Sequence, residues 1–197
     1  DKMLRLLQGD VGSGKTIVAF LTLISTVEAG FQGAFMAPTE ILARQHFEFL
    51  KPIASGIGIS VDIITGKDTK SKRALILEKL ETGATNLLIG THALFQNEVK
   101  FKNLGYAVID EQHKFGVNQR LALGDKGAGT NILIMTATPI PRTLTMIGYG
   151  DLDISYLTSK LPGRIPIKTK AISSERIEEV IEGINRAIKK GARAYWI

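Results

Sequence analysis

A glycine-rich segment near the start of the chain has the residue types and spacing needed to hold phosphate groups. It fits the pattern G-x-x-x-x-G-K-[ST], in which backbone N–H groups and a helix N-terminus converge on phosphate oxygens. We expect Lys15 to bridge the β- and γ-phosphates and the Thr16 hydroxyl to hold Mg²⁺. The segment predicts nucleotide binding rather than a simple glycine-rich turn. The predicted nucleotide-binding residues are Gly9, Asp10, Val11, Gly12, Ser13, Gly14, Lys15 and Thr16.

Two adjacent carboxylates indicate what happens to the nucleotide. An apolar run over residues 106–109 ends in Asp110 and Glu111. At the carboxyl end of a parallel strand, Asp110 would face Mg²⁺ and Glu111 would polarise the water that attacks the γ-phosphate. Alone, this pair is also typical of an exposed acidic turn. Together with the glycine-rich loop, it predicts ATP hydrolysis with Mg²⁺ as cofactor.

Hydroxyl groups after a later apolar run could connect this centre to another surface. Thr136 and Thr138 lie in the segment Met-Thr-Ala-Thr-Pro-Ile-Pro-Arg-Thr. Their hydroxyls could hydrogen-bond Glu111 or His113 beside the γ-phosphate. They could equally cap a helix that begins at Arg142, with the two prolines shaping its entry. The residues are compatible with both interpretations.

The elements that must position these residues follow a β-α alternation. Short apolar runs alternate with stretches of helical period, which is typical of a parallel sheet covered by helices on both faces. Thr39 is a predicted helix cap, Pro52 an approximate helix end and Gly83 a helix C-terminus. We predict strands over residues 4–8, 33–37, 61–65, 86–90, 106–110 and 131–136, and helices over 15–28, 40–53, 70–82 and 142–147.

A change of composition divides the chain near residue 160. Two prolines and a glycine interrupt the alternation over residues 159–166 and predict a linker. Beyond it we expect a strand over 167–172, a helix ending near Gly191 and a further strand from residue 194. So short a piece cannot bury a core of its own, so we expect residues 160–197 to open a second domain that is cut short. The predicted helix face is Ile177, Val180, Ile181, Ile184 and Ile188.

Composition and charge narrow the class of protein. The 197 residues include no cysteine, which excludes disulfides and thiolate metal sites and fits a cytoplasmic location. The longest apolar stretch, residues 17–24, is far shorter than the ~20 residues that cross a bilayer, so no membrane partner is expected. The net charge is +6, and residues 160–197 carry nine basic and four acidic residues. This skew fits either a polyanion-binding face or a solvated helix surface.

The order of the motifs resembles superfamily 2 helicases. The segments are GDVGSGKT, MAPTEILARQH, IGTHALF, VIDEQHKFGVNQR and MTATPIPRTL. The DEQH form, GVNQRLAL, YGDLDIS and LPGRIPIKT are similar to RecG-type ATP-dependent DNA helicases. The resemblance implies a RecA-like P-loop domain over residues 1–159 and the start of a second RecA-like domain over 160–197, in a motor for branched DNA at stalled forks and recombination junctions. The alternatives are a duplex translocase of the transcription-repair coupling type, which typically has DEEH, and a nucleotide-gated binding module without turnover.

The same resemblance implies roles for individual residues. The residues implied to couple hydrolysis to movement are His113, Thr136, Thr138 and Arg142. The residues implied to contact nucleic acid are Pro38, Thr39, Glu40, Arg44, Thr65, Gly66, Gly90, Thr91 and His92. A basic cluster of Lys67, Lys70, Lys72 and Arg73 either extends this phosphate surface or supplies solubility. Phe115 either stacks on a base or lies in the core, and Arg120 has no visible partner.

Two parts that such a motor uses, an arginine finger and a wedge domain for branched DNA, are expected outside the chain. The family's arginine finger, in a segment of the type Q-x-x-G-R-x-G-R, does not occur in this sequence. Phosphoryl transfer without such a finger can lose a factor of ~10³, so the chain alone is expected to turn over little ATP. The implied partners are therefore DNA, the rest of the second motor lobe and a DNA-binding wedge domain.

Overall fold

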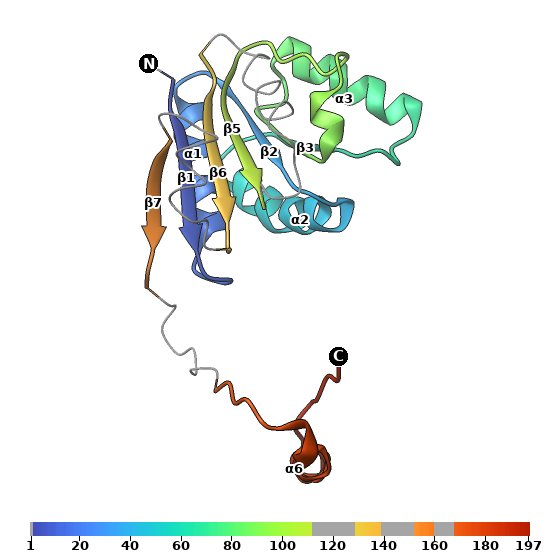
Figure 1. Ribbon diagram of the computed structural model, residues 1–197. Helices are drawn as coiled ribbons and strands as arrows, with labels where there is room; N and C mark the ends of the chain where they lie inside the picture. The colour runs from blue at the N-terminus through green and yellow to red at the C-terminus, as the bar shows by residue number, and fades with distance from the viewer. Residues whose placement is uncertain (1, 112–128, 139–151, 160–167) are drawn as a thin grey trace. The chain divides into compact units, whose positions relative to one another are not determined.

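The computed structural model describes residues 2–111, 129–138, 152–159 and 168–197 (Figure 1). The chain divides into two compact units, Asp1–Pro162 and Gly163–Ile197. The first unit contains both sequence motifs that predict nucleotide chemistry. The predicted helix over residues 142–147 lies outside the described residues.

The first unit is built on a seven-stranded sheet in which every neighbouring pair of strands is parallel. The spatial order is β3-β4-β2-β5-β6-β1-β7. Because the strands are parallel, all the loops that follow them emerge at one carboxyl edge. The strands are β1 (Leu4–Gly9), β2 (Gln32–Met36), β3 (Val61–Ile64), β4 (Leu87–Gly90), β5 (Leu104–Asp110), β6 (Asn131–Thr136) and β7 (Asp153–Leu157).

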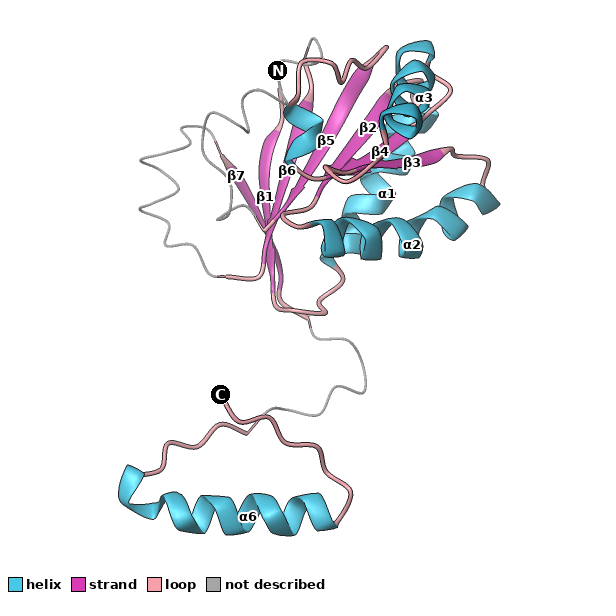
Figure 2. Cartoon of the chain, turned by 90° about the vertical axis from the view of Figure 1, so that its right-hand side faces the viewer, coloured by secondary structure: helices cyan, strands magenta, loops and turns pink. Residues whose placement is uncertain are grey.

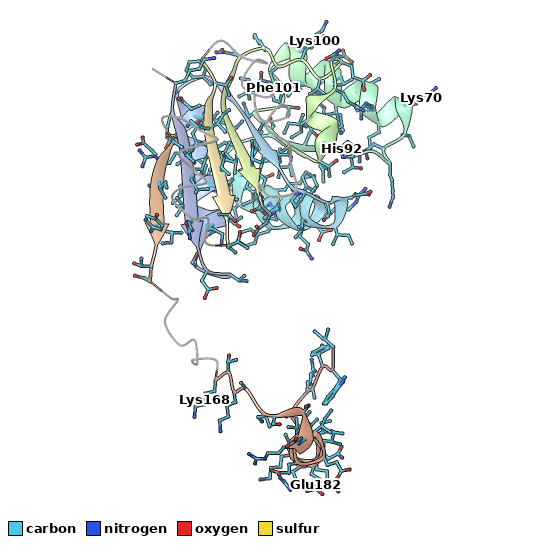
Figure 3. The ribbon with its side chains drawn as sticks, viewed as in Figure 1. Lys70, His92, Lys100, Phe101, Lys168 and Glu182 are labelled. Atoms are coloured by element: carbon cyan, nitrogen blue, oxygen red, sulfur yellow. The ribbon has the colours of Figure 1, made fainter. Side chains whose placement is uncertain are left out.

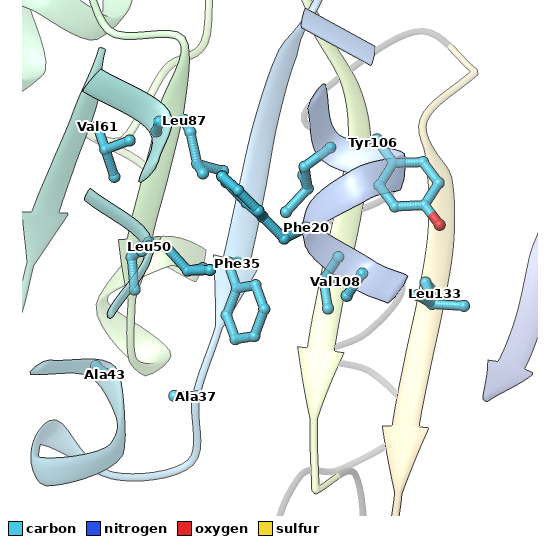
Figure 4. Close-up of a cluster of buried hydrophobic side chains, with 14 of the residues drawn as sticks. Phe20, Phe35, Ala37, Ala43, Leu50, Val61, Leu87, Tyr106, Val108 and Leu133 are labelled. Atoms are coloured by element: carbon cyan, nitrogen blue, oxygen red, sulfur yellow. The ribbon is translucent and has the colours of Figure 1, made fainter. Parts of the chain in front are cut away.

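Helices cover both faces of this sheet, as Figure 2 shows. They are α1 (Lys15–Glu28), α2 (Glu40–Gly56), α3 (Lys70–Thr82) and the short 3₁₀ helix η1 (His92–Phe95). One core contains side chains from α1 and α2, including Phe20 and Leu50, against Phe35 and Val108 of the sheet (Figure 4). A second core contains side chains from α3 and η1. Alternation along β5 places Tyr106 and Val108 in the first core and Ala107 and Ile109 in the second.

Local sequence signals account for most element boundaries. The six predicted strands of the first unit are confirmed to within two residues, and so are the helices predicted to start at Lys15, Glu40 and Lys70. The Thr39 hydroxyl accepts the Leu42 N–H at 3.3 Å as the predicted cap. Gly83 ends α3 in the left-handed conformation at φ 84°.

Pro52 is not a helix end, and that prediction is wrong. Helix α2 continues for one further turn to Gly56 with Pro52 inside it. A proline removes one N–H, and here the carbonyl left without it belongs to Glu48, four residues earlier on the exposed side of the helix. Water can satisfy that carbonyl, so the helix tolerates the proline.

Strand β7 is an edge strand that local pattern did not predict. Its residues are all exposed or half-buried, and it lacks the apolar run that marks the central strands. Arg5 of β1 holds it by donating to Asp153 Oδ2 and Ser155 Oγ, each at 2.9 Å. β1 therefore lies between two neighbours rather than at an edge.

Side chains fasten the opposite, amino edge of the sheet. Gln32 donates to the carbonyls of Leu80 and Thr85 at 2.9 and 2.8 Å and accepts the Asn103 N–H at 2.9 Å. The Asn86 side chain accepts the Ser60 N–H at 2.9 Å, and that of Asn131 accepts the Met3 N–H at 2.8 Å. This amino-edge network, formed by Gln32, Ser60, Asn86 and Asn131, ties neighbouring strands at their starts.

The second unit contains the 3₁₀ helix η3 (Ser174–Arg176) and the helix α6 (Ile177–Lys189), which confirms the predicted helix. The predicted strands over 167–172 and from 194 are wrong over residues 168–172 and 194–197, which have no regular secondary structure. A strand needs a neighbour for its backbone hydrogen bonds, and no described strand of this unit supplies one. Within the described ranges, no helix is long and apolar enough to cross a membrane.

Candidate nucleotide and nucleic-acid site

The carboxyl edge of the sheet brings the predicted chemistry together. In the strand register Gln8 pairs with Thr136, and Met135 pairs with Asp110. The glycine-rich loop, the threonine segment and the carboxylate pair therefore follow three adjacent strands, β1, β6 and β5. The nucleic-acid residues implied by family resemblance follow β2, β4 and β3 on the other half of the same edge. The sheet thus divides the site into a β5-β6-β1 half and a β3-β4-β2 half.

The glycine-rich loop turns directly from β1 into α1. Gly12 and Gly14 have φ values of 73° and 93°, a left-handed conformation that favours glycine. Gly14 caps α1, and its carbonyl accepts the N–H groups of Ile17 and Val18 at 3.0 and 3.1 Å. The helix N-terminus and the N–H groups of its first turn are therefore placed at the loop, which suits a bound phosphate.

Lys15 lies back over the loop that precedes it. Its ammonium group donates to the carbonyls of Gly9 and Asp10 at 2.6 and 3.0 Å. These two bonds hold the positive charge at the mouth of the loop rather than in bulk solvent. The Lys15 ammonium group is therefore placed where it could contact a phosphate held by the loop.

Asp110 and Glu111 occupy the end of β5. Asp110 is buried, and alternation along the strand directs its side chain to the face that carries α1 and α2. Glu111 has φ 48° and is the one non-glycine residue with positive φ in the part of the chain that the structure describes. Such a conformation costs about 1–3 kcal/mol and is concentrated at functional sites. The backbone therefore leaves the extended conformation of β5 directly after Asp110.

Thr136 and Thr138 are hydrogen-bonded to one another. Their hydroxyl oxygens lie 2.9 Å apart, and the Thr138 N–H donates to the Thr136 hydroxyl at 3.1 Å. Thr136 is buried at the end of β6, whereas Thr138 is exposed. The pair forms a turn between the glycine-rich loop and the carboxylates. It gives the predicted relay segment a defined shape beside both motifs.

His46 is a site residue that was not predicted from the sequence. It lies on α2, and its Nε2 is 3.1 Å from Asp110 Oδ2. Its ring packs against Phe35 of β2, with ring centroids 4.6 Å apart. The available signal was a histidine within the buried stripe of α2 that contains Ala43, Leu50 and Ala54.

The donor set suits magnesium. The hydroxyl of Thr16 and the carboxylate of Asp110 are oxygen ligands, which Mg²⁺ prefers. Among the described residues no three His, Cys, Asp or Glu side chains form a metal-binding group. Mg²⁺ is typically held by one or two carboxylates together with substrate phosphates, so such a cage is not required. The Ser13 hydroxyl oxygen is buried without a described hydrogen-bond partner, so a ligand at the loop could satisfy it.

A cavity of about 370 Å³ adjoins the glycine-rich loop on the β7 side. It is open and lined by the ends of β1 and β7 and by Ala137 after β6. The lining residues are Gln8, Gly9, Asp10, Ala137, Tyr156, Leu157 and Thr158. The unpredicted edge strand thus forms one wall beside the glycine-rich loop.

On the other half of the edge, Glu40 holds two exposed cations. Arg44 donates to Glu40 Oε1 through Nε at 3.1 Å and Nη2 at 2.9 Å, and Lys67 Nζ lies 3.4 Å from Oε2. The hydrogen bond from Arg44 is the main cause that lowers the pKa of Glu40 below its ordinary value. This ion-pair group, Glu40–Arg44–Lys67, joins the start of α2 to the loop after β3. Pro38 and Thr39 precede it directly.

Asp68 fixes the loop after β3. Its carboxylate accepts the Thr65 N–H at 2.6 Å, the Thr65 hydroxyl at 3.1 Å and the Lys72 ammonium at 2.6 Å. Thr65 is 1% exposed, so both of its donors are used inside the loop. Gly66 and Lys67 are exposed instead. Thr65 therefore supports the loop structurally, whereas Gly66 is exposed, and a nucleic-acid contact at these two residues stays a prediction.

The loop after β4 combines a buried turn with an exposed histidine. A Cβ on Gly90 would lie 2.7 Å from the Ile64 carbonyl oxygen, so the approach of β3 to β4 requires glycine. Thr91 is buried and precedes η1, whereas His92 is exposed on the β3-β4 side of the sheet (Figure 3). Of the three predicted contact residues, His92 presents its side chain to solvent.

The basic cluster in the loop after β3 and the first turn of α3 is largely paired with acidic side chains. Lys72 binds Asp68, and Arg73 binds Glu98 at 2.5 Å and also donates to Gln96. Lys67 pairs with Glu40 at the edge. These pairs favour a structural role for Lys72 and Arg73, while Lys70 is exposed at the start of the helix. Four further predictions, for His113, Phe115, Arg120 and Arg142, lie outside the described residues.

Comparison with known proteins assigns the family. Residues 2–147 match the family profile of DEAD/DEAH box helicases. An ATP-dependent DNA helicase RecG of Staphylococcus epidermidis is 50% identical over 196 residues, and one of Aquifex aeolicus is 49% identical over 197 residues. These alignments cover 100% and 99% of this chain but 29% and 25% of the relatives. The chain therefore spans little more than a quarter of the length of the curated relatives that it matches.

Solved structures agree with this assignment. The structure of RecG bound to a three-way DNA junction superposes with a TM-score of 0.82 at 44% identity, over 98% of this chain and 26% of that one. The helicase MrfA bound to DNA has a TM-score of 0.67 at 20% identity over 95% of this chain and 30% of that one, which supports the fold alone. The first unit has the RecA-like helicase fold that the sequence predicted. The chain belongs to the DEAD/DEAH box helicases, with RecG helicases as homologues along its whole length.

Proposed function

We propose that this chain is the nucleotide-hydrolysing part of an ATP-driven DNA helicase that acts on branched DNA, such as stalled forks and recombination junctions. The observation that carries the proposal is the convergence of the glycine-rich loop, the threonine segment and the Asp110–Glu111 pair on three adjacent strands. The identity of about 50% to RecG helicases favours this substrate over that of a transcription-repair coupling translocase.

In this proposal the β5-β6-β1 half hydrolyses ATP. Residues 9–16 wrap the phosphates, and Lys15 neutralises charge on the β- and γ-phosphates. Thr16 and Asp110 would hold Mg²⁺, which when bound neutralises the charge that develops on the phosphate oxygens. Glu111, at the positive-φ position directly after β5, orients the attacking water and accepts its proton. His113 and Arg142, with the Thr136–Thr138 turn, pass the state of the site to moving parts.

The β3-β4-β2 half would hold the DNA backbone. Loops at the carboxyl ends of strands present backbone amides and small side chains, which can grip phosphates whatever the base sequence. The exposed groups there are those of Thr39, Arg44, Gly66 and His92. Pro38, Thr65, Gly90 and Thr91 shape these loops from beneath. Translocation along DNA requires such sequence-independent contacts.

The division of the chain into two units supports a two-lobed motor. We propose that residues 1–159 are the first motor lobe and that residues 160–197 are a linker and the start of the second. The apolar residues on α6, Ile177, Ile181 and Ile188 among them, are exposed. They would pack against the rest of the second lobe, and a wedge domain of the same protein would hold the branch point. A DNA substrate and the lack of cysteine fit a cytoplasmic location.

The proposal is tested by ATP hydrolysis of the full-length protein with different DNA structures. We expect strong stimulation by three-way and four-way junctions and weaker stimulation by plain duplex of equal length. Glu111→Gln should lower the stimulated rate by about 10²–10⁴-fold while nucleotide binding remains, because only the water-activating group is lost.

Three outcomes would contradict the proposal. Turnover that survives in Glu111→Gln would remove Glu111 from hydrolysis. Equal stimulation by duplex and junction would favour a duplex translocase. Nucleotide binding with no turnover on any DNA would favour a nucleotide-gated binding module.

A further inference from the structure

His46 lies at the contact between the two halves of the carboxyl edge. It belongs to α2, which begins in the β3-β4-β2 half. It contacts Asp110, which ends β5 in the β5-β6-β1 half. The two residues are 64 positions apart in the sequence. They meet because β2, which leads into α2, lies beside β5 in the sheet.

The direction of this hydrogen bond follows from the chemistry of its partners. An ionised carboxylate has no proton to donate, so His46 Nε2–H donates to Asp110 Oδ2 across 3.1 Å. The side chains are 14% and 12% exposed, so little water competes for the bond. Phe35 is fully buried and supports the imidazole ring from β2. The imidazole is therefore held on one side by the core and on the other by the carboxylate.

Such a bond restricts how Asp110 can present its oxygens. With Oδ2 engaged by His46, rotation of the carboxylate about its Cβ–Cγ bond is limited. Partners of this kind orient metal-binding carboxylates, and removing them typically lowers metal affinity or activity by about 10–100-fold. His46 thus acts on the reaction through Asp110 rather than by touching the nucleotide.

The same helix carries the ion-pair group of the other half. Arg44 precedes His46 by two residues, which is about 3 Å along a helix axis. Both residues lie in one continuous helix of 17 residues, which packs on the core through Ala43, Leu50 and Ala54, and closely packed interiors transmit strain. A displacement of α2 when Arg44 meets DNA phosphate would therefore displace His46 relative to Asp110.

We propose that His46 is a positioning residue that orients Asp110 and links DNA contact at the start of α2 to the Mg²⁺–ATP site. This inference rests on the proposed function and adds a connection within it. It differs from the predicted relay through Thr136 and Thr138, which runs along β6 instead of α2.

The test compares His46→Ala, His46→Gln and Gln45→Ala in the full-length protein. Glutamine places an N–H donor close to the position of Nε2, and Gln45 is the exposed neighbour on the same helix. The measurements are kcat and KM for ATP, the Mg²⁺ concentration for half-maximal rate, and the ratio of junction-stimulated to basal turnover. Thermal unfolding of each variant reports its folding.

We expect His46→Ala to lower kcat about 10–100-fold and to raise the required Mg²⁺ about tenfold, with KM for ATP changed less than about threefold. The ratio of stimulated to basal turnover should fall as well. His46→Gln should recover most of the kcat, and Gln45→Ala should match the wild type in every measurement.

Several results would overturn the inference. His46→Ala with wild-type kcat and Mg²⁺ dependence would show that Asp110 needs no such partner. Equal losses in His46→Ala and His46→Gln, accompanied by lower unfolding temperatures, would reduce His46 to a packing residue. An unchanged stimulation ratio would remove the link to DNA. A wild-type protein that junction DNA does not stimulate would instead overturn the proposed function, so the two failures are distinguishable.

Discussion

The two halves of the carboxyl edge hold their polar groups in different ways. In the β5-β6-β1 half, Asp110 and Thr136 are buried and hydrogen-bonded, and the backbone at Glu111 is strained. In the β3-β4-β2 half, Arg44 and Lys67 are exposed and share one carboxylate, Glu40. Hydrolysis benefits from groups that are fixed before the reaction. A moving grip on DNA benefits from exposed ion pairs, which are weak and exchange readily.

Lys15→Ala should give the largest effect, and the effect should be limited to the function of the β5-β6-β1 half. Loss of the ammonium group at the glycine-rich loop should lower ATP hydrolysis by about 10²–10³-fold, since a preorganised charge on the transferred phosphoryl group is removed. DNA affinity without nucleotide should not change. Hydrolysis rates and DNA binding by fluorescence anisotropy check this, with Lys51→Ala as the control. Hydrolysis within tenfold of the wild type would contradict the role of Lys15.

Gly90→Ala should destabilise the β3-β4-β2 half locally. The added methyl group would lie 2.7 Å from the Ile64 carbonyl oxygen and 3.0 Å from a side-chain carbon of Leu94. We expect a loss of about 1–3 kcal/mol, measured by hydrogen exchange of the peptides that cover β3 and β4. Gly66→Ala is the control, because an added Cβ there meets nothing within 4 Å. Equal protection in both variants would show that the β3–β4 approach can relax.

Arg44→Ala should weaken DNA binding without changing basal hydrolysis. Removal of one phosphate contact should lower affinity similarly on all sequences and reduce the slope of log K against log salt by about 1. Lys51→Ala is a second cation on α2, three turns beyond the start of the helix, and should leave the slope unchanged. A salt slope that Arg44→Ala does not alter would place the DNA elsewhere.

Asp68→Asn should have the smallest effect, and it should depend on pH. Burial raises the pKa of Asp68, but hydrogen bonds from Lys72 and Thr65 lower it more, so the net pKa lies below the ordinary 3.8. A lowered pKa stabilises the fold above pH ~4, and this contribution is lost as the pH falls through the folded-state pKa. We expect a loss of about 1 kcal/mol at pH 7 that shrinks towards pH 3, followed by hydrogen exchange at α3. A loss that is constant with pH would exclude the charge of Asp68 as its cause.

Local patterns predicted the parts of the site that lie within one segment of sequence. The β1–loop–α1 unit follows from an apolar run, three glycines and a helical period, and the end of β5 follows from an apolar run before Asp110. β7 was not predicted because an edge strand buries little surface and shows no apolar run. The extension of α2 past Pro52 escaped because proline weakens a last turn without always ending it.

The His46–Asp110 contact shows where such patterns stop. It depends on β2 lying beside β5, and the alternation of elements does not specify the order of strands in a sheet. The use of Thr65 as a partner of Asp68 has a similar cause. A threonine after a strand suits both a phosphate contact and a turn, and the hydrogen bonds to Asp68 depend on a loop shape that local pattern does not specify.

The amino-edge network has a consequence for how this domain can change over time. Gln32, Ser60, Asn86 and Asn131 join strand starts at the end of the sheet opposite to the candidate site. We expect substitutions there to alter the free energy of folding without moving the residues of the candidate site. We therefore expect stability and activity to be separable in this domain, so that a stabilising substitution at the amino edge can offset a destabilising change at the carboxyl edge.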